Sequence, residues 1–284
     1  MTQLTRARVS LSISVVVVMV AAALWWTVSR DQGETSMPNN AAPADVSAGD
    51  LATASTARVF FGHQSVGMNV LEGLPALYAD HGMPAPRIEQ GRRPLTTPGG
   101  FVEHDYLGVN EQPLGKIQDF DQALRSGLAE HIDIAMMKLC YIDFRTDTDV
   151  DALFAAYRDT VEALERDFPD ITVVKATVPL MTDRRGLSQL KARLSGNDRF
   201  GPAENVARER FNTLVRERYA GDHLFDVAAA ESTAPDGSRS GGRHDGQDYF
   251  ALYDGYASDP GHLNAQGAKV AAGTWVRVVA GAIR

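Results

Sequence analysis

Two short segments of the chain carry residues that could perform nucleophilic chemistry together. Ser65 follows an apolar run near the start of the chain, and Asp259 and His262 stand three residues apart in a turn sequence near its end. A carboxylate that binds one imidazole nitrogen leaves the other nitrogen free to deprotonate a serine hydroxyl. These residue types therefore predict acyl transfer through a serine nucleophile.

Each segment also has an ordinary structural interpretation. Ser65 could simply cap the helix that the following residues predict, because serine accepts hydrogen bonds from free N–H groups at helix starts. The run Asp259-Pro260-Gly261 is a common turn sequence. His63 and Gln64, just before the serine, are candidates for substrate contacts, and His63 could equally be a structural histidine of the loop.

The rest of the chain alternates between strand-like and helix-like patterns. Apolar or β-branched runs predict strands at residues 58–61, 132–140, 171–179 and 223–227, with a weaker candidate at 86–90. Apolar residues at three- and four-residue steps predict helices at 149–168 and 202–219, and a last helix that Asn264 caps. This alternation predicts an α/β fold with a parallel sheet and helices on both faces. Ligands bind outside the carboxyl ends of such strands, where both candidate loops lie.

The two loops resemble the SGNH/GDSL hydrolase superfamily over about residues 57–284. The specific part is Asp259-Pro260-Gly261-His262-Leu263-Asn264, followed by Gly267, which is similar to the family's closing motif. The resemblance implies a three-layer α/β/α sandwich, flavodoxin-like, with about five parallel strands. It also implies Ser65 as nucleophile, His262 as general base and Asp259 as its orienting partner, without a metal or organic cofactor.

Two motifs depart from the family pattern. His63 and Gln64 separate Gly62 from Ser65, so either the turn holds an extra residue or Gln64 occupies the usual serine position; the first is favoured, because glutamine is no acyl nucleophile. The asparagine that donates to the oxyanion in the family is missing from residues 139–143, which read Leu-Cys-Tyr-Ile-Asp. Gly108 and Asn110 are the candidate replacements.

The N-terminal residues 1–30 predict a membrane anchor or a signal segment. Residues 9–29 contain no charge, and a helix of that length reaches roughly 32 Å, enough to cross a bilayer. Arg6 and Arg8 precede the run, which favours a cytoplasmic N-terminus. Residues 31–56 predict a flexible linker. The expected location is the inner membrane, single-pass, with the domain in the periplasm or outside the cell; the alternative is a cleaved signal and secretion.

Composition excludes several classes of protein. The net charge of −8 argues against a nucleic-acid binder, which needs a basic surface. Cys140 is the only cysteine, so no intramolecular disulfide can form, and a packed strand position is expected for it. The aromatic run 249–256 could stack on sugars or simply pack.

The function expected is an exported serine hydrolase that cleaves small acyl esters, such as acetyl groups on carbohydrate. The expected partners are therefore a small acyl ester or acetylated carbohydrate, and the membrane through the N-terminal helix. Two alternatives stay open, namely an O-acyltransferase variant and a catalytically lapsed envelope protein that keeps the fold for binding.

Overall fold

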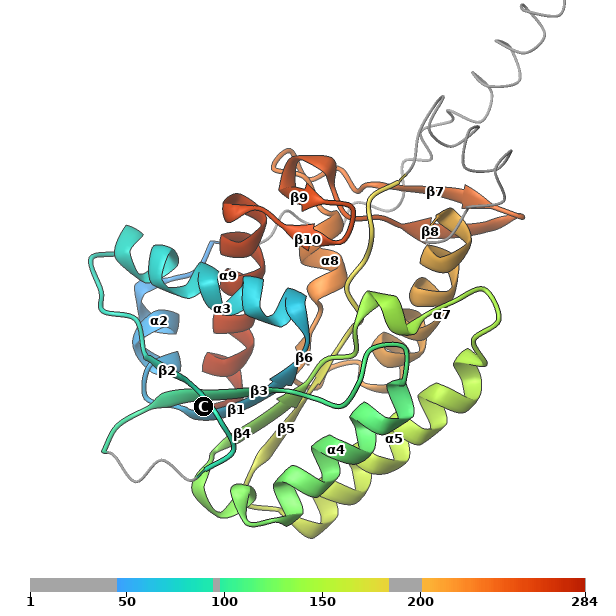
Figure 1. Cartoon of the computed structure of the whole chain (residues 1–284). Helices are drawn as coiled ribbons and strands as arrows, with labels where there is room; N and C mark the ends of the chain where they lie inside the picture. Colours follow the sequence, from blue (N-terminus) through green and yellow to red (C-terminus); the bar gives the residue numbers. More distant parts are fainter. Residues whose placement is uncertain (1–44, 94–97, 184–200, 284) are drawn as a thin grey trace, which may run out of the picture.

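The computed structural model describes residues 45–93, 98–183 and 201–283. Its centre is a six-stranded sheet in the order β2-β3-β1-β4-β5-β6, in which every neighbouring pair is parallel (Figure 1). The strands are β1 (Arg58–His63), β2 (Arg87–Gln90), β3 (Phe101–Tyr106), β4 (Ile134–Met137), β5 (Thr172–Ala176) and β6 (Leu224–Phe225). The predicted α/β class is confirmed, with one strand more than expected.

Helices cover both faces of this sheet and give three layers (Figure 1). One face carries α2 (Ala48–Ala54), α3 (Ser65–Asp80), α8 (Val227–Ser232) and α9 (Ala265–Ile283), and the other carries α4 (Pro113–Arg125), α5 (Val150–Asp167) and α7 (Pro202–Arg218). Alternate residues of β1 serve the two layers: Val59 and Phe61 pack with the first group of helices, and Phe60 packs with the second. All three side chains are fully buried, so β1 is a central strand, as its uninterrupted apolar run predicts.

The strand that the sequence did not predict is β3. It contains Glu103 and His104, which are polar yet almost fully buried. Polar residues break the apolar run on which strand prediction depends. The strand nevertheless pairs with β1 on one side and β2 on the other, which explains its burial.

The predicted linker ends earlier than residue 56. Residues Ala48–Ala54 form α2, which Ser47 and Asp50 start with reciprocal capping hydrogen bonds. Leu51 is fully buried in the cluster that α9 also lines. The small residues of this segment predict a linker, but in the structure they allow the short helix to pack against the domain. Residues 31–44 of the expected linker lie outside the described residues.

Smaller elements complete the fold. They are the 3-10 turns η1 (Leu128–His131), η2 (Tyr141–Asp143) and η3 (Asp254–Tyr256), and the two-stranded pairs β7 (Gly241–His244) with β8 (Gln247–Phe250) and β9 (Ala257–Asp259) with β10 (His262–Leu263). Within the described ranges no helix is long and apolar enough to span a bilayer. The expected anchor, residues 9–29, falls outside those ranges.

Candidate active site

Ser65, His262 and Asp259 form a continuous chain of hydrogen bonds. His262 Nε2 lies 2.9 Å from Ser65 Oγ, and His262 Nδ1 lies 2.8 Å and 2.9 Å from the two carboxylate oxygens of Asp259. A neutral imidazole that donates from Nδ1 to the carboxylate must accept at Nε2, so the serine hydroxyl donates to it. Ser65 and His262 are 197 positions apart in the chain. The three residues selected from the sequence therefore meet in the geometry of a nucleophile, a base and an orienting acid.

The first loop positions the serine at a helix start. β1 continues through His63, Gln64 is the N-cap position, and Ser65 is the first residue of α3. Gln64 does not cap the helix with its side chain; its amide instead donates to the carbonyl of Leu107 at 2.6 Å. Ser65 rather than Gln64 therefore contacts His262, as favoured from the sequence. The first N–H groups of α3 donate to no side chain of the N-cap residue, and they lie beside the serine.

The second loop positions the histidine through a tight hairpin. Asp259 and His262 are register partners across β9 and β10, so the Pro-Gly turn between them brings their side chains to one side. The N–H of Leu263 donates to Asn69 Oδ1, which joins this hairpin to α3 one turn beyond Ser65. Asn264 then caps α9 by accepting from two backbone N–H groups, as predicted.

The carboxylate of Asp259 is charged and oriented. Burial raises its pKa, but hydrogen bonds from the N–H of Gly261 and from His262 outweigh that effect and hold the pKa below its ordinary value. The side chain is 52% exposed and that of His262 is 32% exposed, so the site opens to solvent. An ionised partner at Nδ1 favours the imidazolium that forms when His262 takes a proton.

Three of the predicted supporting residues have other roles. His63 is fully buried, with Nδ1 2.8 Å from the carbonyl oxygen of Gln64 and Nε2 3.0 Å from His104 Nδ1, so it cannot contact a substrate. The N–H of Gly108 donates to Asp119, and Asn110 accepts from Lys116. The bond to Asp119 occupies the N–H of Gly108 and so contradicts its assignment as an oxyanion donor. Lys116 binds only the side-chain oxygen of Asn110, so the assignment of the Asn110 amide N–H₂ stays a prediction.

Gln64 is the fourth predicted contact. Its amide N–H₂ donates to the Leu107 carbonyl, and the residue is half-buried. The side chain therefore ties the serine loop to the segment after β3. It fixes the loop rather than pointing free into the site.

A residue that the sequence did not select lies beside the catalytic pair. The hydroxyl of Tyr141 is 3.5 Å from His262 Nε2, and the two rings meet edge to face at 5.7 Å. Burial raises the pKa of Tyr141 to about 12. The preceding Cys140 is buried, as expected, but it lies at the start of η2 and not on a strand.

Buried charges lie beneath the Tyr141 turn. Lys116 and Asp143 form an ion pair at 2.7 Å with no exposure of either side chain, and Arg208 is also fully buried. Lys138, at the end of β4, is buried as well, and desolvation lowers its pKa. Burial raises the pKa of nearby Glu231 to about 8.

The aromatic run 249–256 does not present stacked rings to solvent. Tyr249 and Tyr256 are almost fully buried, the first donating its hydroxyl to Asp183. Phe250 lies under the guanidinium of Arg239 at 3.3 Å. Packing, the second of the two interpretations, accounts for this segment.

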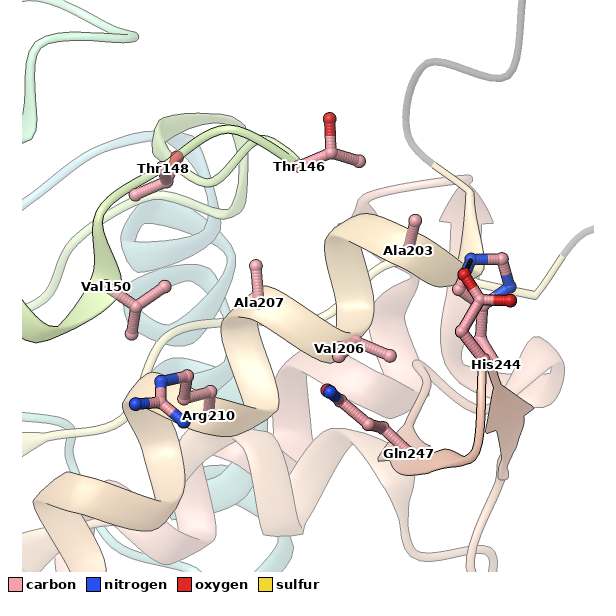
Figure 2. Close-up of a pocket in the computed structure, with 10 residues that line it drawn as sticks. Thr146, Thr148, Val150, Ala203, Val206, Ala207, Arg210, His244 and Gln247 are labelled. Atoms are coloured by element: carbon pink, nitrogen blue, oxygen red, sulfur yellow. Dashed lines mark ion pairs between the residues drawn. The ribbon is translucent and has the colours of Figure 1, made fainter.

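A polar pocket of about 460 Å³ lies away from these residues, between the loop that precedes α5, the start of α7 and the β7–β8 hairpin. Figure 2 shows hydroxyl, imidazole, amide and guanidinium groups along its wall. The lining residues are Thr146, Thr148, Val150, Ala203, Val206, Ala207, Arg210, His244, Asp245 and Gln247. None of them belongs to the hydrogen-bonded triad. In the described part of the chain no group of three or more His, Cys, Asp or Glu side chains is placed to hold a metal ion.

No family model and no curated protein sequence matches this chain. Its arrangement is similar to that of several solved structures. One is a protein from Streptococcus pneumonia described as a platelet activating factor, 13% identical, with a TM-score of 0.46, over 90% of this chain and 96% of that one. A second is a lipolytic protein of the G-D-S-L family from Desulfitobacterium hafniense DCB-2, 13% identical, with a TM-score of 0.43, over 78% of this chain and 99% of that one.

A third similar structure is the periplasmic domain of a lipopolysaccharide acetyltransferase from Salmonella ser. Paratyphi A. It is 13% identical, with a TM-score of 0.39, over 77% of this chain and 81% of that one. At these identities the chemistry of the site follows from the chain's own residues and their distances.

Proposed function

We propose that the protein is a serine esterase that acts through Ser65, His262 and Asp259. The observation that carries the proposal is the unbroken hydrogen-bond chain from the serine hydroxyl to Asp259. A cap serine needs no imidazole on its hydroxyl, and a turn histidine needs no carboxylate on its other nitrogen. A fold kept only for binding has no requirement for this arrangement, which favours the enzyme over the lapsed binding protein.

The geometry supports a two-step acyl transfer. Ser65 Oγ attacks the acyl carbon while its proton passes to His262 Nε2, and Asp259 stabilises the resulting imidazolium. The imidazolium then protonates the leaving alcohol as the carbon–oxygen bond breaks, which leaves an acyl group on Ser65. Water, deprotonated by His262, attacks this acyl-enzyme and releases the acid. An acyltransferase differs only in the last step, where an acceptor hydroxyl replaces water.

We also propose that the acyl group is small and is carried on carbohydrate outside the cytoplasm. Half-exposure of Asp259 and partial exposure of His262 leave the site open enough for a polymer to approach. Export follows from the charge-free run at residues 9–29 and the basic residues before it. Short-chain aryl esters and acetylated polysaccharides are therefore the substrates to screen.

The test uses an organophosphonate and two serine variants. The reagent should label one serine in the wild type, at Ser65, and Ser65→Ala should lower turnover of p-nitrophenyl acetate by at least about 10³-fold. Ser126→Ala is the matched control, because Ser126 is an exposed serine at the end of α4 that should leave turnover unchanged. Labelling at another serine, or full activity of Ser65→Ala, refutes the proposal.

A further inference from the structure

The inference concerns Tyr141, at the turn η2 that follows β4. Its hydroxyl lies 3.5 Å from His262 Nε2, the same nitrogen that lies 2.9 Å from Ser65 Oγ. The hydroxyl therefore stands beside the bond across which the proton moves. Any substrate carbonyl that Ser65 attacks must lie next to this pair.

The backbone of Tyr141 is fixed by buried charges from distant parts of the chain. Arg208 Nε donates to its carbonyl oxygen at 2.9 Å, from inside the protein. Asp143, at the other end of the turn, accepts from the N–H of Cys140 at 2.8 Å and from Lys116 Nζ at 2.7 Å. Burying such groups is unfavourable unless each is paired, and here the pairs hold one three-residue turn.

The side of the ring that faces the catalytic hairpin needs a glycine. A Cβ at Gly261 would lie 2.5 Å from Cζ of Tyr141 and 2.8 Å from its hydroxyl oxygen. Carbon atoms do not approach so closely, so any side chain at this position must displace the ring. Gly261 thus allows Tyr141 to lie directly against the residue that precedes His262.

The hydroxyl is available as a donor at neutral pH. Burial raises the pKa of Tyr141, so the group stays protonated, and the neutral imidazole already accepts from Ser65. The N–H of Gly108 already donates to Asp119, and the side-chain oxygen of Asn110 already accepts from the buried Lys116. The Tyr141 hydroxyl is a side-chain donor that complements the N–H groups at the start of α3.

We propose that the Tyr141 hydroxyl donates a hydrogen bond to the oxyanion that forms when Ser65 attacks the substrate carbonyl. This inference rests on the proposed esterase function and assigns a catalytic residue that the family pattern does not contain at this place. The tyrosine would take the place of the missing asparagine with a longer side chain, on a turn that buried charged groups hold in position.

The experiment compares Tyr141→Phe with wild type in hydrolysis of p-nitrophenyl acetate and in inhibition by phenylboronic acid. Boron bound to Ser65 becomes tetrahedral and anionic, so it reports the stabilisation of an oxyanion. We expect kcat to fall about 100-fold with KM changed less than about threefold, and the inhibition constant of the boronic acid to rise by a similar factor.

Tyr78→Phe is the matched control. It also removes a buried tyrosine hydroxyl, one that donates to the Leu51 carbonyl at 3.0 Å. Tyr78 lies on α3, roughly 20 Å along the helix from Ser65 at about 1.5 Å per residue. We expect its kcat and its boronic acid inhibition to remain within about twofold of wild type.

A second variant keeps the inference testable by an independent route. Gly261→Ala should displace the Tyr141 ring and lower kcat. In a Tyr141→Ala background the clash is absent, so the same glycine substitution should have a several-fold smaller effect. Equal effects in both backgrounds contradict the inference.

Two further results would overturn it. The first is a kcat of Tyr141→Phe within about threefold of wild type. The second is a lowered kcat with unchanged boronic acid inhibition, because then Tyr141 only positions His262. Phosphonate labelling of Ser65 in the wild type is measured first. If Ser65 is not labelled, the esterase proposal fails and this inference fails with it. If Ser65 is labelled and either of the two kinetic results is found, only the role of Tyr141 is refuted.

Discussion

Lowering the pH from 7 to 4 should destabilise the fold by about 3 kcal/mol through His63 alone. The residue is fully buried, and desolvation, reinforced by the positive charge of Lys138, lowers its pKa from 6.5 to about 3. Between these two values the unfolded chain binds a proton that the folded chain refuses. Stability from this group is therefore complete above pH 6.5 and is lost as the pH falls.

The hydrogen bonds of His63 explain why the fold refuses that proton. The carbonyl of Gln64 can only accept, so Nδ1 of His63 carries the hydrogen and Nε2 accepts from His104 Nδ1–H. A proton on Nε2 would place two N–H groups head to head at 3.0 Å. The pKa of His104 is also lowered, chiefly by burial, so His104 does not take up the proton in place of His63.

The size of the effect follows from the two pKa values. One proton costs about 1.4 kcal/mol per pH unit between them, and integration from pH 7 to pH 4 gives about 3 kcal/mol. The measurement is urea unfolding at each pH for wild type and His63→Phe, which fits among Phe61, His104 and Tyr106. The variant loses about 1–3 kcal/mol at pH 7, because His104 Nδ1 loses its acceptor and the Gln64 carbonyl keeps only the N–H of Gly67.

The stability of wild type relative to the variant should fall by about 3 kcal/mol as the pH falls to 4, so that the variant there equals or exceeds wild type in stability. Ser126→Ala is the control, since Ser126 is exposed at the end of α4 and has no titrating side chain, and its difference from wild type should stay constant with pH. A difference between wild type and His63→Phe that stays constant over the same range would refute the reasoning, since it would mean that His63 titrates alike in both states.

Two further predictions concern the acid of the triad and the N-terminal segment. The kcat of Asp259→Asn should remain about tenfold to 100-fold above that of Ser65→Ala, because the carboxylate orients the imidazole without attacking the substrate. Steady-state kinetics measure both values, and equal losses of kcat would contradict this division of roles. The full-length protein should stay in the membrane fraction after an alkaline wash, because residues 9–29 carry no charge. A chain of residues 45–284 should remain in the supernatant. A soluble mature form that starts near residue 24 would show a cleaved signal instead.

Local patterns predicted the strands that lie at the middle of the sheet. β1, β4 and β5 are mainly apolar and are buried on both faces, and apolar runs indicate such strands. β3 carries Glu103 and His104 inside, and the pairing with β1 and β2 that keeps it in the sheet is invisible in a local pattern. The helix α2 was missed for a related reason, because its small residues become a packing surface only when α9 is present.

The same distinction separates the triad from its surroundings. Asp259 and His262 lie three residues apart, so their contact depends on one turn, and a turn is encoded locally. Whether a backbone N–H or a side-chain amide is free to bind an oxyanion depends on which other residue it already contacts in the fold. Asp119 takes the N–H of Gly108, and neither the sequence near the glycine nor its resemblance to a family motif reveals that partner.

The proposed role of Tyr141 shows how a site could supply an oxyanion donor without the asparagine of the pattern that the sequence resembles. The catalytic pair is partly exposed and comes from short loops, but the tyrosine turn is held by Lys116, Asp143 and Arg208, which are buried and come from three separate elements. An ion pair out of water is stable only if its partners remain in place, so the turn cannot relax without leaving charges unpaired. A longer side chain on a rigid turn can reach the position that a shorter amide reaches from a different backbone. The proposed oxyanion role of Tyr141 therefore requires these buried charges as much as it requires Gly261.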